Sequence, residues 1–488
     1  MVALVAALSR CDADVVPSVI TMLKALSHRG TGTCELVTPT VTVSARSHEE
    51  LREHVNEPSN VAIGHHGPNA ILSRCGLSRL TNDCATVVLG QVLPRSSASR
   101  HDKDLTDEKD KCEGAAERLL TNFEGAFTFA VASPRQMLIG RDQLGVMPLY
   151  YGSDMKICAV ATERKALWKV GVEQAYSFPP GNLAKANRRG FTFEIASAIT
   201  KPPQEKIELN AAARRLQKLL EESTLKRVCD VTRVGVAFSG GLDSSVVACL
   251  AKKCDVSVDL ISVGLEGQPE LAHAEKAAEA LGLPIKLHAF GIREVDEALS
   301  RVLWLIEEPD VMKISVAIPF FWTAKIASKL GCHVLLAGQG ADELFGGYRR
   351  YLTVYERNGA EKVAETLYHD MIFSYETNFQ RDGPVCAFHK VDLRLPFVDT
   401  DVVRFALSLP VDLRIASATD GLRKRVLRQV AYNLGIPAFI AEKPKKAVQF
   451  ATGVDKALRS GARDKGLTAR EYVEEAFRSV YPNWGRSE

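Results

Sequence analysis

The chain has 488 residues, of which 46% are hydrophobic and 25% charged, a composition typical of a globular protein with two or three domains. Its formal net charge of +3 is too small to indicate a nucleic-acid or anionic-membrane partner. No apolar run approaches the roughly 20 residues that span a bilayer, and the eleven cysteines include no Cys-x-x-Cys pair typical of a zinc or redox site.

Residues 1–199 predict a domain of short strands and turns. The apolar residues 1–8 lack the basic segment of a signal peptide, so they predict a core strand and a cytoplasmic protein. Further strands are predicted at 41–43, 85–89, 126–132, 136–139, 157–161 and 191–194. The polar stretch 95–113 predicts a surface loop, and 200–208, with two prolines, predicts a linker.

Residues 209–488 predict a second domain, which begins with a helix over 209–228. Strands and helices then alternate. Strands are predicted at 234–238, 258–263, 285–290 and 334–337, and helices at 242–253, 270–281, 293–307 and 317–330. This alternation is typical of a doubly wound α/β fold, a parallel sheet covered by helices on both faces. After about residue 348 the chain is predicted to be mostly helical.

A glycine-rich turn lies between the first of these strands and its helix. Its sequence is Ser239-Gly240-Gly241-Leu242-Asp243-Ser244-Ser245. Glycines let backbone N–H groups approach a phosphate, and a helix N-terminus adds partial positive charge. The turn lacks the Lys-Ser/Thr of a Walker A loop. It resembles instead the pyrophosphate loop of ATP pyrophosphatases, which cleave ATP between the α and β phosphates.

A second glycine-rich turn, Gly338-Gln339-Gly340-Ala341-Asp342, follows the strand predicted at 334–337. Ligands of parallel sheets bind at the carboxyl ends of the strands, so the two turns are expected to face one nucleotide. Asp243 and Asp342 would then both present carboxylates near the triphosphate, where Mg²⁺ is commonly held by one or two carboxylates and phosphate oxygens.

Several segments of the second domain occur in the order found in the glutamine-dependent asparagine synthetase family. They are Phe238–Ser245, Ile261–Leu265, Leu336–Tyr348, Val391–Asp399 and Lys443–Phe450. On these segments the chain resembles archaeal asparagine synthetase-related proteins. The resemblance implies a ligase that activates aspartate with ATP as a β-aspartyl-adenylate, releases pyrophosphate and AMP, and forms asparagine.

The same resemblance assigns the site residues. ATP is expected to contact Phe238, the turn 239–245, Val263, Ala337 and Gly338, and Mg²⁺ is expected at the two aspartates. Lys445 would stabilise the adenylylation transition state, where a cation offsets charge that spreads over the α-phosphate oxygens. By its sequence alone, the run Lys443–Lys446 is more typical of a solvated basic surface.

Two positions depart from the family. Gln339 stands where the family has a glutamate thought to accept a proton from ammonia, and an amide cannot act as a general base. Water, a phosphate or Glu343 remains as the acceptor. In the segment 307–319, Ser315 stands near the place of an arginine that some synthetases carry.

The first domain resembles class II glutamine amidotransferases, which implies an Ntn-type αββα sandwich. The matching segments are Leu26–Gly30, Phe123–Ala130, Gly140–Tyr151, Ala161–Leu167 and Phe178–Gly181. Val2 stands where that family has its nucleophilic cysteine, and Leu89-Gly90-Gln91 replaces the usual Asn-Gly-Glu. Thr31-Gly32 also replaces Pro-Asp. We therefore expect a domain that keeps its fold without glutaminase activity, and an enzyme that uses ammonia.

Other functions remain open. A non-catalytic nucleotide-binding descendant of the family is one, and a ligase for a different carboxylate or amine is another, as in the similar β-lactam synthetases. tRNA modification is disfavoured by the near-neutral charge and the lack of a catalytic Cys-x-x-Cys. The expected partners are small molecules, with no nucleic acid and no membrane, and the chain could form a homodimer.

Overall fold

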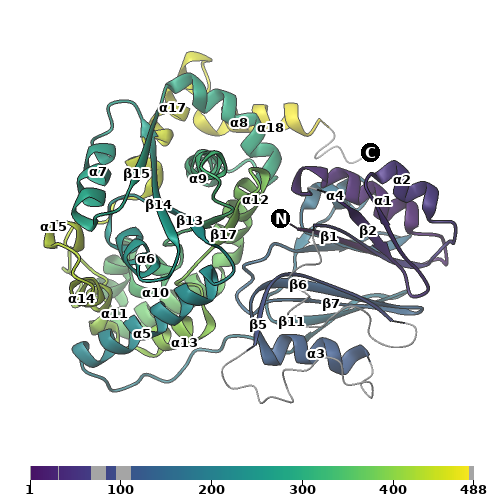
Figure 1. Cartoon of the computed structure of the whole chain (residues 1–488), viewed down its shortest axis with the longest axis horizontal. Coiled ribbons are helices and arrows are strands. Elements are labelled where there is room, and N and C mark those ends of the chain that lie inside the picture. Colours follow the sequence, from purple (N-terminus) through teal and green to yellow (C-terminus); the bar gives the residue numbers. More distant parts are fainter. Residues whose placement is uncertain (1, 31, 68–83, 95–111, 483–488) are drawn as a thin grey trace. The chain divides into compact units, whose positions relative to one another are not determined.

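The computed structural model describes residues 2–30, 32–67, 84–94 and 112–482. The chain forms two compact units, Met1–Thr200 and Lys201–Glu488 (Figure 1). Most of the loop predicted at 95–113 lies outside the described residues, and its last two residues begin a helix.

The N-terminal unit contains two stacked antiparallel sheets. The first has the order β10 (Tyr176–Ser177), β8 (Tyr150–Ser153), β9 (Ile157–Ala161), β1 (Ala3–Ser9), β4 (Val61–His66), β2 (Cys34–Val37) and β3 (Thr42–Ala45). The second has the order β12 (Gly190–Ile195), β11 (Asn182–Asn187), β7 (Gln136–Arg141), β6 (Phe123–Ser133) and β5 (Ala85–Pro94).

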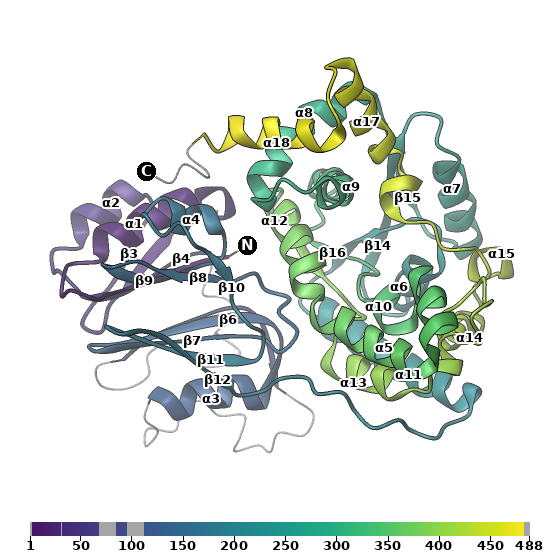
Figure 2. The same ribbon diagram turned by 180° about the vertical axis from the view of Figure 1, so that it is seen from behind.

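Helices cover both outer faces of this pair of sheets. Figure 2 shows α1 (Val16–Ala25), α2 (His48–His54) and α4 (Arg164–Trp168) on one side and α3 (Cys112–Asn122) on the other. A 3₁₀ turn, η1 (Ser27–Arg29), follows α1. A disulfide joins Cys84, before β5, to Cys112 at the start of α3, a pairing that the sequence did not predict. The layers are those of the predicted αββα sandwich.

Strand β1 shows why this unit is layered. All seven of its residues are buried, because the strand has a protein layer on each face. Ala3, Val5 and Ala7 pack in the core beneath the helices. Leu4, Ala6 and Leu8 pack in the core between the sheets. The period of two in a strand thus divides one apolar run between two cores.

The C-terminal unit is built on one parallel sheet. Its order is β15 (Ile285–Phe290), β14 (Ser257–Leu265), β13 (Arg233–Ala237), β16 (Val334–Leu336) and β17 (Asp392–Arg394). From β13, the next two strands along the chain, β14 and β15, lie on one side of it. The following two, β16 and β17, lie on the other side. The strand order therefore reverses between β13 and β16, the position where doubly wound sheets bind ligands.

Helices lie on both faces of the parallel sheet (Figure 1). The first part of the unit contains α5 (Leu209–Val228), α6 (Leu242–Lys252), α7 (Pro269–Leu281), α8 (Ile292–Ile306), α9 (Val311–Lys329) and α10 (Ala341–Phe345). The next part contains α11 (Arg350–Ile372), the π-helix η4 (Tyr375–Phe379), α12 (Gln380–Phe388), α13 (Thr400–Ser408) and η5 (Val411–Leu413). The last part contains α14 (Arg425–Asn433), α15 (Ala438–Ala441), α16 (Val448–Ala451), α17 (Val454–Asp464) and α18 (Ala469–Val480).

Helix α9 corrects the helix predicted at 317–330. It begins at Val311, because the Asp310 carboxylate accepts a hydrogen bond from the Lys313 N–H at 2.7 Å and caps the helix. Pro319 therefore lies inside the helix. Among the helices of the described ranges, α9 alone is long and apolar enough to cross a membrane, but most of it is buried within the unit. We interpret it as a core helix.

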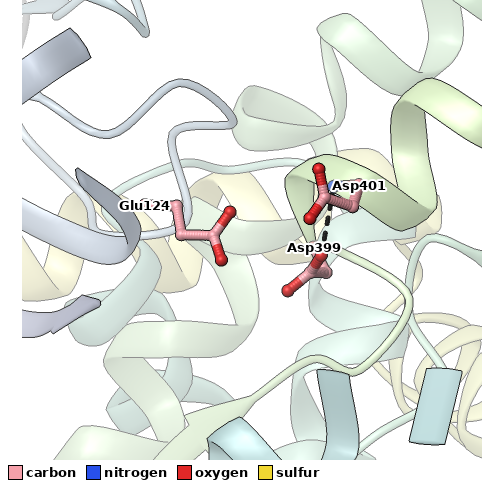
Figure 3. Close-up of side chains that lie close together, drawn as sticks. All are labelled: Glu124, Asp399 and Asp401. Atoms are coloured by element: carbon pink, nitrogen blue, oxygen red, sulfur yellow. Dashed lines mark hydrogen bonds between the residues drawn. The ribbon is translucent and has the colours of Figure 1, made fainter. Parts of the chain in front are cut away.

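The segment Val391–Asp399, singled out in the sequence, contributes to the core. Arg394 pairs with Asp230 just beyond α5, and Arg227 of α5 donates to Asp399 at 3.1 Å. Asp399 also accepts the Asp401 N–H at 3.1 Å and so caps α13 (Figure 3). These contacts fasten α5 to β17 and α13. The short strand β17 was not predicted within this region.

Candidate functional site

The glycine-rich turn 239–241 connects β13 directly to α6. Ser239 donates its N–H to Ser244 Oγ at 3.2 Å, and Gly241 donates its N–H to Ser239 Oγ at 3.3 Å. Gly241 is the N-cap of α6, and no side chain caps the helix. The first-turn N–H groups of α6 are therefore left for an anion, as in phosphate-binding turns.

Gly240 is a position where a side chain would not fit. Its φ is +65°, in the left-handed region that favours glycine. A Cβ there would lie 2.9 Å from the Cα of Ala274 in α7. The loop is thus packed against α7 by its own backbone.

Two aspartates and two lysines converge at the head of this loop. Lys424 Nζ lies 2.7 and 2.6 Å from the two carboxylate oxygens of Asp243. It also lies 2.5 Å from Asp342 Oδ1. Lys445 Nζ lies 2.7 Å from Asp342 Oδ2 and 3.8 Å from Asp243 Oδ2. The two carboxylates predicted to hold Mg²⁺ are therefore close enough to share the same ammonium groups.

Charge within this cluster is mutually stabilised. Burial alone would raise the pKa of Asp342, but Lys424 and Lys445 outweigh burial and hold it well below its usual range. Burial would likewise lower the pKa of Lys445, but Asp342 and Asp243 raise it above its usual value. Asp342 and Lys445 thus carry full charge near neutral pH, which suits binding of a polyanion with its cation.

Lys424 is the member of the cluster that sequence reasoning missed. Its side chain is 3% exposed, and its φ of +53° is unusual for a non-glycine residue. It lies 181 residues from Asp243 in sequence. The only available signal was the run Arg423-Lys424-Arg425, which is also typical of a solvated surface.

Gly347 makes room for this cluster. A Cβ at this position would overlap Asp342 Oδ1 and Lys424 Cε. The backbone N–H of Gly347 donates to the Asp342 carbonyl at 2.8 Å, and its carbonyl accepts from Arg423 Nε at 3.2 Å. The second glycine-rich segment therefore packs directly around the charged side chains.

The remaining predicted nucleotide residues lie at the carboxyl edge of the same sheet. Gly338 approaches Asp243 so closely that a Cβ on the glycine would lie 2.9 Å from the aspartate Cβ. Ala337 is buried directly after β16. Phe238 is buried directly after β13. Val263 lies on β14 and is half-buried. Their contact with a nucleotide remains a prediction.

Gln339 has a partner that the sequence did not suggest. Its Nε2 donates to Asp382 Oδ2 at 2.5 Å. Arg381 also donates to the Asp382 carboxylate, from Nε at 2.7 Å and from Nη2 at 2.9 Å. Asp382 and Arg381 are both buried in α12. The neutral amide at position 339 therefore matches an anionic neighbour, which a glutamate would oppose.

Glu343 lies on the other side of Asp342 in α10. It accepts hydrogen bonds from the Tyr348 hydroxyl at 2.7 Å and from Asn378 Nδ2, supplied by η4, at 2.8 Å. Burial and the charge of Asp342 raise the pKa of Glu343. A carboxyl group with a raised pKa can act in proton transfer near neutral pH. Ser315 bonds within its own helix, to the Val311 carbonyl at 2.7 Å.

The N-terminal unit has no nucleophile at the start of β1. The residue there is Val2. Cys11 lies beyond the other end of β1, about 20 Å away at 3.3 Å per strand residue, and is exposed. On β5, the Leu89 side chain is buried in the core between the sheets and cannot donate a hydrogen bond. Thr31 lies outside the described residues.

A buried polar scaffold nevertheless remains in that unit. Glu163 lies 3.1 Å from His28 Nε2 and pairs with Arg29 and Lys165. Burial disfavours its charged form, but Lys165, Arg29 and His28 outweigh burial and lower its pKa. This cluster supplies packing and charge balance.

Two family models match different parts of the chain. The family described as "Asparagine synthase" matches residues 215–360 and 354–482, and the "Glutamine amidotransferase domain" matches 111–180. A Methanocaldococcus jannaschii protein named as a glutamine-hydrolysing asparagine synthetase is 30% identical over 93% of this chain and 94% of its own length. Among solved structures, a glutamine phosphoribosylpyrophosphate amidotransferase from B. subtilis aligns over 58% of this chain and 65% of its own, with 17% identity and a TM-score of 0.33.

More distant relatives match a smaller part of the chain. Asparagine synthetase B of Escherichia coli is 28% identical over 69% of this chain, and asparagine synthetase 1 of Arabidopsis thaliana is 27% identical over 70%. The aligned regions span 62% and 60% of those two relatives, less than two thirds of their lengths.

Proposed function

Because the chain belongs to the asparagine synthase family, we propose that it is an ATP-dependent carbon–nitrogen ligase that converts aspartate to asparagine with free ammonia. The observation that carries this proposal is the convergence of Asp243, Asp342, Lys424 and Lys445 at the head of the glycine-rich turn before α6. The site has the charges to hold a triphosphate and to stabilise its cleavage.

The proposed reaction has two steps. An oxygen of the substrate carboxylate attacks the α-phosphorus of ATP, and the bond to the β-phosphate oxygen breaks to release pyrophosphate. Ammonia then attacks the acyl carbon, a proton leaves the nitrogen, and AMP departs with the former carboxylate oxygen. The N–H groups at the start of α6 bind phosphate oxygens, and Lys445 offsets the charge that develops on the α-phosphate.

Mg²⁺ fits the donor set of the site. Asp243 and Asp342 offer hard oxygen ligands, and the two carboxylates lie close enough to share the ammonium groups of Lys424 and Lys445. When bound, the ion would neutralise charge on the phosphates. Lys424 and Lys445 then remain free to pair with phosphate oxygens.

Ammonia is proposed as the nitrogen source because two positions of the N-terminal unit carry side chains that do not suit glutamine hydrolysis. Val2 has no thiol, and Leu89 has no donor for an oxyanion. Glu343, which accepts hydrogen bonds from Tyr348 and Asn378, is the candidate to accept a proton from the attacking nitrogen.

Location and assembly belong to the same proposal. We place the protein in the cytoplasm, where it acts on small molecules and could form a homodimer.

The test is an omission assay. Purified protein is incubated with ATP, Mg²⁺, aspartate and ammonium, and pyrophosphate, AMP and asparagine are measured as each component is left out. We expect equal amounts of all three products, and no pyrophosphate without aspartate. Asp243→Asn should lower pyrophosphate release at least about 1000-fold, because it removes a metal ligand and the partner of a buried lysine. Asp255→Asn, an exposed aspartate after the same helix, is the matched control.

Two other outcomes would select a different function. Nucleotide binding without pyrophosphate release would support the non-catalytic descendant. Pyrophosphate release with another carboxylate in place of aspartate would support a related ligase. The neutral Gln339 bound to Asp382 favours including such carboxylates in the assay.

A further inference from the structure

One face of α7 contacts two parts of the proposed site. They are the pyrophosphate loop and the segment that carries Lys445. Glu270 and His273 are three residues apart on this helix and so share a face. Neither was singled out by the sequence, and neither lies in the cluster of aspartates and lysines.

His273 contacts the pyrophosphate loop. Its Nε2 lies 2.8 Å from the Gly240 carbonyl oxygen, as a hydrogen-bond donor to it. This contact occurs at the glycine whose left-handed backbone turns the chain toward α6. The His273 ring also packs edge-on against Phe439 of α15, with ring centroids 6.1 Å apart. The packing against Phe439 therefore holds the imidazole of His273 in place, and its hydrogen bond orients the Gly240 carbonyl of the loop.

Glu270 contacts the segment that carries the proposed catalytic lysine. Residues 443–447 have no regular secondary structure. Within them, Lys445 pairs with Asp342, whereas the next residue, Lys446, pairs with Glu270. Neighbouring side chains of an extended segment point to opposite sides. The ion pair to α7 thus fixes the rotation of the segment that directs Lys445 into the site.

The chain is also held in place before and after this segment, at Phe439 and at Thr452. At one end, Lys276 Nζ lies 5.1 Å from the centroid of the Phe439 ring. At the other, the Leu265 N–H of β14 donates to the Thr452 carbonyl at 2.8 Å. The Lys446–Glu270 pair lies between these anchors. The Glu270 side chain is 19% exposed and that of Lys446 48% exposed, so the pair is partly shielded from water.

We propose that Glu270 and His273 are positioning residues, through which α7 sets the pyrophosphate loop and Lys445 in one geometry. His273 acts on nucleotide binding through Gly240, and Glu270 acts on turnover through Lys446. This inference rests on the proposed function for its effect on turnover, but its structural part does not require that reaction.

The experiment separates the two contacts by what each changes. Nucleotide affinity is measured by calorimetry with Mg²⁺ and α,β-methylene-ATP, and turnover by pyrophosphate release. His273→Ala should weaken analogue binding about 5- to 10-fold, as expected for a lost hydrogen bond, and His273→Gln, which keeps a donor, should restore most of it. Glu270→Ala should lower kcat about 3- to 5-fold, the scale of a partly exposed ion pair, with analogue affinity unchanged.

A charge exchange and a control complete the test. The double variant Glu270→Lys with Lys446→Glu should recover at least half of the lost turnover. Glu275→Ala, an exposed glutamate on the same helix, should match the wild type in affinity and turnover. Hydrogen exchange of residues 442–450 should be faster in Glu270→Ala than in Glu275→Ala.

Three results would overturn the proposal. They are equal hydrogen exchange of residues 442–450 in Glu270→Ala and Glu275→Ala, failure of the double variant to recover half of the turnover lost in Glu270→Ala, and unchanged analogue binding in His273→Ala. If the wild type releases no pyrophosphate, the proposed function fails, while exchange and analogue binding still decide the role of α7.

Discussion

The turn after β13 and the start of β1 differ in their reacting groups. The sequence predicts such groups at the turn and excludes a nucleophilic cysteine at the start of β1. After β13, the ammonium groups of Lys424 and Lys445 each lie 2.5–3.8 Å from carboxylate oxygens of both Asp243 and Asp342. At β1, the residue is Val2, although the buried cluster of Glu163, His28 and Arg29 persists in the same unit. The comparison teaches that a unit can keep a buried polar cluster at a place where the residue expected to react is absent, so the fold alone does not establish an activity.

The largest expected effect concerns the nitrogen source. With ATP, Mg²⁺ and aspartate, ammonium should support asparagine formation. Glutamine should yield glutamate at least about 1000-fold more slowly than in a class II amidotransferase that has its N-terminal cysteine. Because Asp342 and Lys445 stay charged near neutral pH, the rate should rise with the NH₃ fraction as pH increases. Enzymatic glutamate detection checks this. Stoichiometric glutamate coupled to ATP cleavage would contradict our interpretation of Val2.

Lys445→Met should reduce turnover about 100-fold with little change in nucleotide affinity, because the cation acts mainly on charge that develops in the transition state. Pyrophosphate release and analogue calorimetry measure the two quantities. Lys443→Met is the matched control, because Lys443 lies in the same segment without a contact in the charged cluster. Equal turnover in the two variants would return Lys445 to the solvated-surface interpretation.

Gln339→Glu tests whether the protein stays stable with a glutamate at position 339, the residue that the family has there. The new carboxylate would face Asp382 at the distance of a hydrogen bond. We expect destabilisation by about 3 kcal/mol at pH 8, the scale for an uncompensated buried charge. The loss should shrink at lower pH, where one of the two carboxyl groups binds a proton. Urea unfolding at both pH values measures this, and a fully stable variant with higher turnover would contradict it.

The smallest effect concerns the scaffold that remains in the N-terminal unit. His66 Nε2 lies 3.1 Å from both the Leu23 carbonyl oxygen and His48 Nε2. Burial lowers the pKa of His66 to about 4. In the unfolded chain its pKa is near the usual 6.5, so acid protonates the unfolded state first. The stabilisation is present above pH 6.5 and is lost as the pH falls toward 4.

His66→Asn should remove this dependence. Between pH 7.5 and pH 5, the wild type should lose about 2 kcal/mol more unfolding free energy than the variant, from the linkage of that pKa difference. The matched control is His54→Asn, at an exposed histidine of the same unit. An equal pH dependence in His66→Asn and the wild type would refute the buried neutral state of His66.

The local pattern of apolar and polar residues in the sequence predicted many of the helices and strands. The prediction of a helix over 209–228 and of a strand over 285–290 matches α5 and β15. The three-residue strand β17 was missed, since Asp392 and Arg394 give it no apolar pattern. The start of α9 was missed, because Pro319 obscured a helix that Asp310 caps.

The candidate site was harder to predict where it depends on long-range contacts. Asp243 and Asp342 follow two strands of one sheet, so topology predicted their proximity. Lys424 directly precedes α14 and Asp382 lies in α12, and no strand order places either residue. Their roles depend on tertiary packing of side chains far apart in sequence.

The most direct test of the acyl-adenylate follows the oxygen of the substrate carboxylate. The enzyme is incubated with ATP, Mg²⁺, ammonium and aspartate labelled with ¹⁸O in its β-carboxylate, and the AMP produced is analysed by mass spectrometry. Our account predicts one ¹⁸O atom in the phosphate of each AMP, because the carboxylate oxygen attacks the α-phosphorus and leaves with it. Unlabelled AMP, or ADP and phosphate in its place, would contradict it.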